Sequence, residues 1–230
     1  MAKQLPRVTL TFDNGPTAGT TPFVLEQLHI RNLSAYFCVI GKKLSSADEH
    51  VDIARETLRL GHRLVNHTYD HATTLGEKPT DNHAQHEIDE MDQLMQELLG
   101  DWGEKWFRPY GKEGRMGPHL FSSAALNRLE ELSYSVLLWN SVPRDWVNPT
   151  DWIGPALTDI RNQQHTLIVL HDIDSGAMQQ LPRFLDQLQE SGVTTTLDLP
   201  DSCVLMTNGR LAFDQAAMSK LTIDAAPLPD

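Results

Sequence analysis

Side chains that can transfer protons or bind a metal ion follow several apolar stretches of this chain. Each stretch has the length of a β-strand, and the polar groups come at its end or just after it. These groups are Asp13 and Asn14 after RVTLTF, His67 and His71 after RLVN, Arg108 and Tyr110 within KWFRPY, Asn140 and Asp145 after SVLLW, and His171 closing HTLIVLH. Carboxylates and imidazoles serve as general acids and bases, and two imidazoles spaced i, i+4 can bind one metal ion. The five groups could therefore form a catalytic site.

Each group also has an ordinary structural explanation when it is taken alone. Asp13 and Asn14 precede Gly-Pro and favour an Asx-type turn. The spacing of His67 and His71 is common by chance in a chain with 10 histidines, and His171 could be a buried histidine with satisfied hydrogen bonds. Five such groups at the same end of alternating strands are poorly explained by chance, so we interpret them as one site.

The elements that must position these groups alternate between strands and helices. Seven strand candidates are separated by segments with helical spacing of apolar residues, at about 21–31, 47–60, 81–100, 118–132, 151–164 and 179–191. This order predicts parallel strands covered by helices, as an open doubly wound sheet or a barrel of α/β units. In a barrel, the loops after the C-terminal ends of the strands form the active face. His83 and His86 lie on the polar side of the 81–100 helix, and we expect them to be solvated.

The composition is that of an ordinary globular protein and excludes several classes of partner. Of 230 residues, 40% are hydrophobic and 22% are charged, and the formal net charge is −12. An acidic chain is unsuited to a nucleic-acid backbone or an anionic membrane surface, so we expect neither partner. No apolar run approaches the length of a membrane span, and MAKQLPRVTLTF has no signal-type apolar region, which predicts a cytoplasmic protein.

The length predicts a single domain over residues 1–230, with a core at about 7–199 and a less regular C-terminal appendage at 200–230. Cys38 lies within the apolar run AYFCVIG, far from Cys203. Two cysteines do not form a disulfide framework, so we predict that both are reduced. The sequence leaves the oligomeric state open.

In their order along the chain and in their residue patterns, these segments resemble the motifs of the polysaccharide deacetylase family, the NodB-homology group of carbohydrate esterases similar to family 4. The resemblance covers roughly residues 7–199. TFDNGP resembles the family's TFDDGP motif, and LGHRLVNHTYDH resembles its second motif, in which Gly-His and Asn precede a His-Ser/Thr-x-x-His pair. FRPYG is similar to the family's Arg-Pro-Pro-Tyr-Gly turn, while WNSVPRDW and VLHD resemble the fourth and fifth motifs.

The resemblance implies a distorted (β/α) barrel with about seven parallel strands, and hydrolysis of an amide, usually an N-acetyl group on an amino sugar. By the family's mechanism, Asp13 would be the general base that takes a proton from the attacking water. His171 would be the general acid that protonates the leaving nitrogen, and Asp145 would orient it. Arg108 would hold Asp13 ionised. The backbone N–H of Tyr110 would point at the oxyanion.

The resemblance also implies a divalent metal, with Zn²⁺ the first candidate, bound by His67 and His71 and polarising the amide carbonyl. The family's second Asp is a further metal ligand, and this chain has Asn14 in its place. Loss of that negative charge predicts a metal that is weakly bound or absent. RPYG is one proline shorter than the family's motif, and His62, which matches the Gly-His of the second motif, is interpreted as structural.

The leading interpretation is a C–N hydrolase that acts on a small N-acyl amine, an amino sugar or an oligosaccharide. One alternative is a related amidohydrolase that cleaves a cyclic imide or ureide without a metal. Another is a catalytically silent sugar-binding module in which Asn14 marks decay of the site. The joint presence of Asp13 and His171 favours an enzyme, since a pure binder has no need of a matched base and acid.

Overall fold

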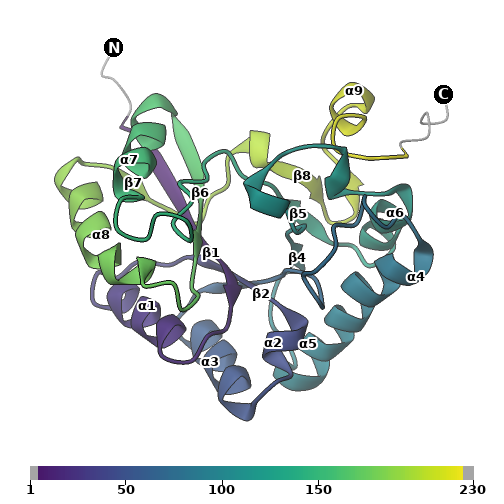
Figure 1. Cartoon of the computed structure of the whole chain (residues 1–230), viewed down its shortest axis with the longest axis horizontal. Helices are drawn as coiled ribbons and strands as arrows, with labels where there is room; N and C mark the ends of the chain where they lie inside the picture. Colours follow the sequence, from purple (N-terminus) through teal and green to yellow (C-terminus); the bar gives the residue numbers. More distant parts are fainter. Residues whose placement is uncertain (1–4, 225–230) are drawn as a thin grey trace.

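The structure is a computed structural model that describes residues 5–224. In this part of the chain, nine strands form one curled sheet (Figure 1). The strands are β1 (Arg7–Gly15), β2 (Tyr36–Val39), β3 (Arg63–Asn66), β4 (Trp106–Phe107), β5 (Ser135–Leu137), β6 (His165–His171), β7 (Thr194–Thr195), β8 (Val204–Thr207) and β9 (Arg210–Leu211). Their order in the sheet is β6-β1-β2-β3-β4-β5-β8-β9, and β7 pairs with the start of β1.

The seven strands expected from the apolar runs are all present, and they pair in parallel. Strand β1 joins the halves of the sheet, because it pairs with β6 from Arg7 to Asp13, with β2 from Thr11 to Gly15, and with β7 at its first two residues. The C-terminal ends of parallel strands meet at one edge, which is where the polar groups stand. The distorted barrel with about seven parallel strands is therefore confirmed, with antiparallel β8 and β9 added beside β5.

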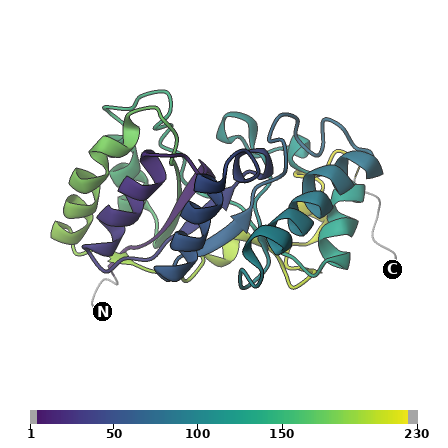
Figure 2. The same cartoon turned by 90° about the horizontal axis from the view of Figure 1, so that it is seen from below.

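Helices lie around the outside of the curled sheet (Figures 1 and 2). They are α1 (Thr20–His29), α2 (Gly41–Leu44), α3 (Asp48–Arg59), α4 (Asp81–Ala84), α5 (Met91–Leu99), α6 (Ser123–Glu131), α7 (Ile153–Asn162), α8 (Leu181–Glu190) and α9 (Gln215–Met218). Helix α8 shows why these segments are helical. Its buried residues Leu181, Phe184, Leu185 and Leu188 follow the i, i+3, i+4, i+7 spacing that places apolar side chains on one face.

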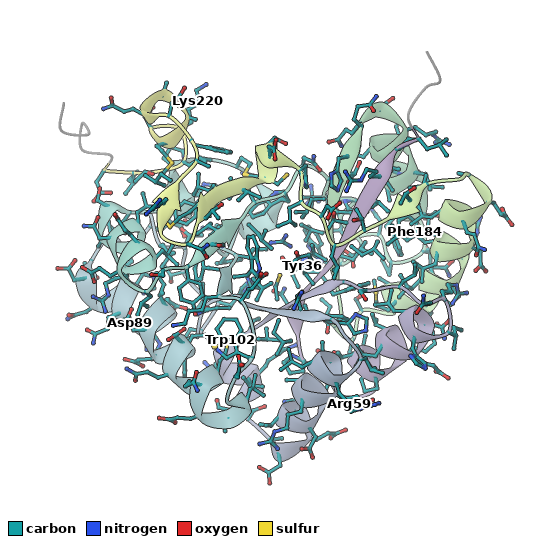
Figure 3. The ribbon with its side chains drawn as sticks, turned by 180° about the vertical axis from the view of Figure 1, so that it is seen from behind. Tyr36, Arg59, Asp89, Trp102, Phe184 and Lys220 are labelled. Atoms are coloured by element: carbon teal, nitrogen blue, oxygen red, sulfur yellow. The ribbon has the colours of Figure 1, made fainter. Side chains whose placement is uncertain are left out.

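Side chains on the two faces of the sheet belong to two different apolar clusters. Phe37 of β2 packs in the large core between the sheet and the helices, and Phe184 lies between α8 and the sheet (Figure 3). The neighbours of Phe37 in β2, Tyr36 and Cys38, point to the inside of the curl and pack in a small second cluster. The Tyr36 hydroxyl donates to the carbonyl of Leu197 at 2.9 Å, which fixes the 197–199 segment inside the curl.

The long helix expected at 81–100 is interrupted by a π-helical segment at Gln85–Glu90. A π turn takes an extra residue, so it shifts the faces of the residues around it. His83 is buried, with only 5% of its surface exposed, and the expectation that it is solvated is wrong. His86 stays partly exposed and bonds to Asp70 and Glu90.

The segment after Asp201 is more ordered than an irregular appendage. Strand β8 pairs antiparallel with β5, and its Leu205 and Met206 are buried. The expectation of an appendage is wrong for residues 204–211, because the short apolar run of β8 pairs with β5 and β9 pairs with β8 at the edge of the sheet. Residues 225–230 of the expected appendage lie outside the described residues. Between residues 5 and 224, no helix has both the length and the apolar character needed to cross a bilayer.

Candidate active site

The polar groups that follow the strands meet around one pocket of about 270 Å³. Six of the residues expected at the site line it, namely Asp13, Asn14, His67, His71, Tyr110 and His171. Arg108 and Asp145 lie behind the pocket wall, and neither side chain has any exposed surface. Asn140 is not part of the pocket lining; its side chain bonds to the backbone of His165 and Leu167 along β6. The structure therefore brings six of the predicted residues together around one pocket and leaves Asn140 outside it, as a structural residue.

Asp13 and His171 are direct neighbours on adjacent strands. In the parallel pairing of β1 with β6, the register aligns Asp13 with His171. Both residues are the last or nearly the last of their strands, so both side chains reach the same edge of the sheet. A carboxylate and an imidazole from positions far apart in the sequence thus stand on either side of one small space.

Asp13 is held as an ionised carboxylate. Nη1 of the fully buried Arg108 donates to Oδ1 of Asp13 at 2.8 Å and to Oγ1 of Thr11 at 2.6 Å. Burial alone would raise the pKa of Asp13, but the Arg108 cation, followed by His67 and His171, lowers it to about 2. The other carboxylate oxygen lies 3.6 Å from Nε2 of His67 and faces the pocket residues.

His171 is oriented and made more basic by Asp145. The Nδ1–H of His171 donates to Oδ1 of Asp145 at 2.8 Å, and its backbone N–H donates to Oδ2 at 2.9 Å. Burial alone would lower the pKa of His171, but the hydrogen bond and the charge of Asp145 raise it. Because Nδ1 is engaged by the carboxylate, Nε2 is the nitrogen left to exchange a proton with a ligand in the pocket.

His67 and His71 present neutral nitrogens to each other, with their Nε2 atoms 3.0 Å apart. The Nδ1 of His67 lies 2.9 Å from the carbonyl oxygen of Arg108. A carbonyl only accepts, so Nδ1 carries the proton and Nε2 of the neutral ring keeps a lone pair. Burial lowers the pKa of His67 and, together with the nearby His67, that of His71. The His71 ring also packs on the ring of Tyr110, with centroids 4.0 Å apart.

The side-chain oxygen Oδ1 of Asn14 is buried and has no hydrogen-bond partner among the described residues. A buried acceptor without a partner is costly, unless something outside the protein fills the gap. Two imidazole nitrogens and an amide oxygen suit borderline divalent cations such as Zn²⁺. The donor set of Asn14, His67 and His71 therefore fits a metal ion, although it carries no negative charge of its own.

A second group with metal-ligating side chains includes Asp70 of the 67–71 loop. Ligand atoms of Asp70, His86 and Glu87 lie within 4.8 Å of one another. Both ring nitrogens of His86 already bond to carboxylates, Nε2 to Asp70 at 3.0 Å and Nδ1 to Glu90 at 2.7 Å. Partial burial opposes charging, but these carboxylates raise the pKa of His86. Because both ring nitrogens of His86 already bond to carboxylates, we assign no metal there.

The backbone around the pocket is strained. Five non-glycine residues of its loops have positive φ angles, namely Asn14 (74°), Thr68 (69°), His71 (54°), Glu113 (61°) and Arg144 (60°). For a β-branched residue such as Thr68 this conformation is a clear outlier. Asn66 supports the turn, because its Oδ1 accepts from the backbone N–H of Thr68 at 3.0 Å. Strain of this kind is found where a fold holds functional side chains in place.

Several residues of the site were not singled out from the sequence. Thr11 bonds to Arg108 from inside β1, and Trp139 and Trp146 form walls of the pocket. Lys112 and Glu113 add charged groups to the pocket lining. Trp139 and Trp146 both occur in the segment WNSVPRDW, but no sequence pattern distinguishes an aromatic residue that forms a pocket wall from one that packs in the core.

Comparisons with known proteins agree with this geometry. A family model described as "Polysaccharide deacetylase" matches residues 2–136, more than half of the chain. A chitooligosaccharide deacetylase of Azorhizobium caulinodans is 29% identical over 168 residues, which cover 72% of this chain and 73% of that protein. The peptidoglycan-N-acetylglucosamine deacetylase PgdA of Listeria monocytogenes is 25% identical over 193 residues, 83% of this chain but only 38% of the Listeria protein.

A solved structure described as a T48 deacetylase with substrate is also similar. It superposes with a TM-score of 0.67 at 25% identity, and the match covers 84% of this chain and 88% of that one. The motifs, the fold and the matched family model agree. The chain belongs to the polysaccharide deacetylase family.

Proposed function

We propose that this protein is a deacetylase that hydrolyses the amide bond of an N-acetyl amino sugar, alone or within an oligosaccharide. The observation that carries the proposal is the pairing of Asp13 with His171 across β1 and β6, beside the neutral imidazoles of His67 and His71. Amide hydrolysis needs a proton acceptor for the attacking water and a proton donor for the leaving nitrogen. The named activities of the Azorhizobium and Listeria relatives support this choice of substrate class.

Asp13 acts as the general base. Its pKa of about 2 makes it fully ionised at neutral pH but a weak acceptor. A cation bound by Asn14, His67 and His71 would raise the acidity of the attacking water and polarise the amide carbonyl, which suits a weak base. The salt bridge to Arg108 keeps the carboxylate aimed at the pocket, and Thr11 fixes the guanidinium from the other side.

His171 acts as the general acid. The carboxylate of Asp145 raises its pKa, so a larger fraction of the imidazole is protonated near neutral pH. The proton on Nε2 is then available for the leaving nitrogen when the C–N bond breaks. Asp145 takes no part in the transfer itself; it fixes the ring and stabilises the imidazolium.

The pocket walls suit a sugar ring. Trp139, Trp146 and Tyr110 present aromatic surface around the catalytic groups, and the pocket is open to solvent-exposed Lys112 and Glu113 at its rim. Aromatic surface with a few polar groups is typical of small-molecule sites. We also propose that the backbone N–H of Tyr110 donates to the oxyanion, as expected from the RPYG segment, and that the cation is zinc.

The test is hydrolysis of N-acetylglucosamine oligomers in the presence of Zn²⁺ or Co²⁺, followed as acetate release and as new free amine in equal amounts. The Asp13→Asn variant is the matched control, because it keeps the shape of the side chain and removes its basicity. Saturable sugar binding without turnover would instead indicate a binding module. Turnover of a cyclic imide that persists in the presence of a chelator would indicate the metal-free amidohydrolase.

A further inference from the structure

We propose that Asn14 is a modification site, at which spontaneous deamidation in the folded protein replaces the side-chain amide with a carboxylate. The modification itself does not depend on the proposed function. Its consequence does, because it would convert a neutral donor beside His67 and His71 into a charged one. The chain as it is synthesised would then be a precursor of a site with higher metal affinity.

The dipeptide Asn14-Gly15 has the chemistry for this reaction. Asparagine deamidates when the backbone nitrogen of the next residue attacks its side-chain carbonyl carbon, and a side chain on that next residue hinders the ring closure. Glycine has none. The chain contains two Asn-Gly pairs, Asn14-Gly15 in the pocket and Asn208-Gly209 on the surface.

The fold requires glycine at position 15. A Cβ built on Gly15 would lie 2.2 Å from Oδ2 of the buried Asp172, far inside contact distance. No other residue fits at this position without moving Asp172. Residue 15 therefore has no side chain of its own to hinder the ring closure by its backbone nitrogen.

The local structure leaves the Asn14 side chain poorly tethered. The pairing of β1 with β2 aligns Asp13 with Cys38 and then Gly15 with Val39, so Asn14 is the extra residue of a bulge. Its φ angle of 74° lies in the left-handed region. Its Oδ1 accepts no hydrogen bond from the described residues. The half-buried side chain lines the pocket, through which water can reach it.

The reaction consumes one water and releases one ammonia, with no change in oxidation state. The Gly15 nitrogen bonds to Cγ of Asn14, and the amide nitrogen Nδ2 leaves as ammonia with the proton from Gly15. Water then adds to the former side-chain carbonyl of the cyclic imide and breaks the new C–N bond. This restores the Gly15 N–H and leaves Asp at position 14. Opening at the other carbonyl would lengthen the backbone of β1 by one atom, which its pairing with β2 and β6 opposes.

The proposal is tested by ageing the metal-free protein in its folded state at mildly alkaline pH. Position 14 is followed by peptide mass mapping, and released ammonia is assayed in parallel. A denatured sample, in which both Asn-Gly pairs react without constraint, sets the timescale. The Asn14→Gln variant is the control, since its longer side chain does not form the five-membered ring readily.

We expect Asn14 in the folded protein to become ordinary Asp, with one equivalent of ammonia that Asn14→Gln does not release. Zinc affinity measured by calorimetry should rise with age by about tenfold or more. The Asn14→Asp variant should show the final affinity from the start. An amide that persists at position 14 after the denatured sample has converted would overturn the proposal. Isoaspartate as the main product, with zinc binding lost, would also overturn it. Neither readout depends on catalytic activity, so failure here is separable from failure of the proposed function.

Discussion

The Asp172 carboxylate lies directly against the backbone of Gly15, where a side chain would otherwise be. Oδ2 of Asp172 accepts a hydrogen bond from Thr21 Oγ1 at 2.6 Å, and the backbone N–H of Asp172 donates to the carbonyl of Asp13 at 3.3 Å. Burial raises the pKa of Asp172 to about 6. Asp172 comes directly after the last residue of β6, and it packs against Gly15 at the end of β1. This contact links the strand of His171, the proposed acid, to the strand of Asp13, the proposed base.

Replacing Gly15 with Ala is therefore expected to destabilise the fold and distort the site. The added Cβ would clash with Asp172 at 2.2 Å, and overpacking of a close-packed interior costs typically about 1–3 kcal/mol. The measurement is the free energy of unfolding in urea. Gly154→Ala is the matched control, because nothing lies within 4 Å of a Cβ at that position. Equal stability of the two variants would mean that the Asp172 contact is not restrictive.

Replacing Asp145 with Asn is expected to move the pH–rate profile. The charge and hydrogen bond of Asp145 raise the pKa of His171, so their loss lowers it and shifts the alkaline limb of the profile to lower pH. His171→Ala should remove that limb and lower the rate by about 10²–10⁴-fold. Asp159→Asn serves as the control, because Asp159 bonds to Ser141 and not to His171. An alkaline limb unchanged in Asp145→Asn would contradict the assigned role of Asp145.

The fold was largely predictable from the sequence, because parallel strands and helices leave strong local patterns. HTLIVLH marks β6 by an unbroken apolar run, and α8 shows a clear helical spacing. The register that sets His171 opposite Asp13 is not encoded locally, since it depends on how two distant strands align. Strand β8 was missed because an apolar run of only a few residues carries no period of its own.

The convergence of the polar groups on one pocket was predictable from the sequence, but the residues that surround them were not. Asp172 carries no local sign of its role, because an acid after a strand is equally typical of a surface loop. The burial of His83 was missed because the helix pattern assumes a regular period, which the π segment at Gln85–Glu90 breaks. The strained turn at Thr68 is likewise a product of tertiary contacts, above all the bond to Asn66.

Acidification is expected to destabilise the protein through His62. Burial, with a smaller effect of His29, lowers the pKa of His62 from 6.5 to about 4, and its Nδ1 accepts a hydrogen bond from the Ala35 backbone N–H at 3.1 Å. The unfolded chain therefore binds a proton that the folded chain excludes. The contribution of neutral His62 to the free energy of unfolding is fully present above the pKa of the unfolded chain, near 6.5, and is lost as the pH falls toward about 4. The loss amounts to at most about 3 kcal/mol.

The measurement for His62 is urea unfolding across this pH range. His62→Gln is the matched variant, because an amide oxygen can accept from Ala35 without titrating. Its unfolding free energy should depend less steeply on pH than that of the unmodified protein. His67 and His71, whose pKa values are also lowered, contribute in the same direction in both proteins and cancel in the comparison. Identical slopes would show that His62 does not stay neutral in the fold.

Replacing Asn14 with Asp is expected to have opposite effects on the metal-free and metal-bound protein. Without a cation, a second carboxylate next to Asp13 adds like-charge repulsion in a largely buried site, so the unfolding free energy should fall. With Zn²⁺ present, the same carboxylate completes a charged ligand set with His67 and His71, and affinity should rise by about tenfold or more. Zinc should then stabilise the variant more than the unmodified protein, because stabilisation grows with ligand concentration relative to Kd.

Thermal unfolding of both proteins with and without Zn²⁺ measures this crossover, and calorimetry gives the affinities directly. Asn208→Asp is the control, since Asn208 is exposed and lies outside the pocket lining. It should add the same charge with no effect on zinc binding. A zinc affinity that is the same with Asn or Asp at position 14 would mean that this side chain does not contact the metal. The unpaired Oδ1 of Asn14 would then need another explanation, because a buried acceptor without a partner destabilises the folded protein.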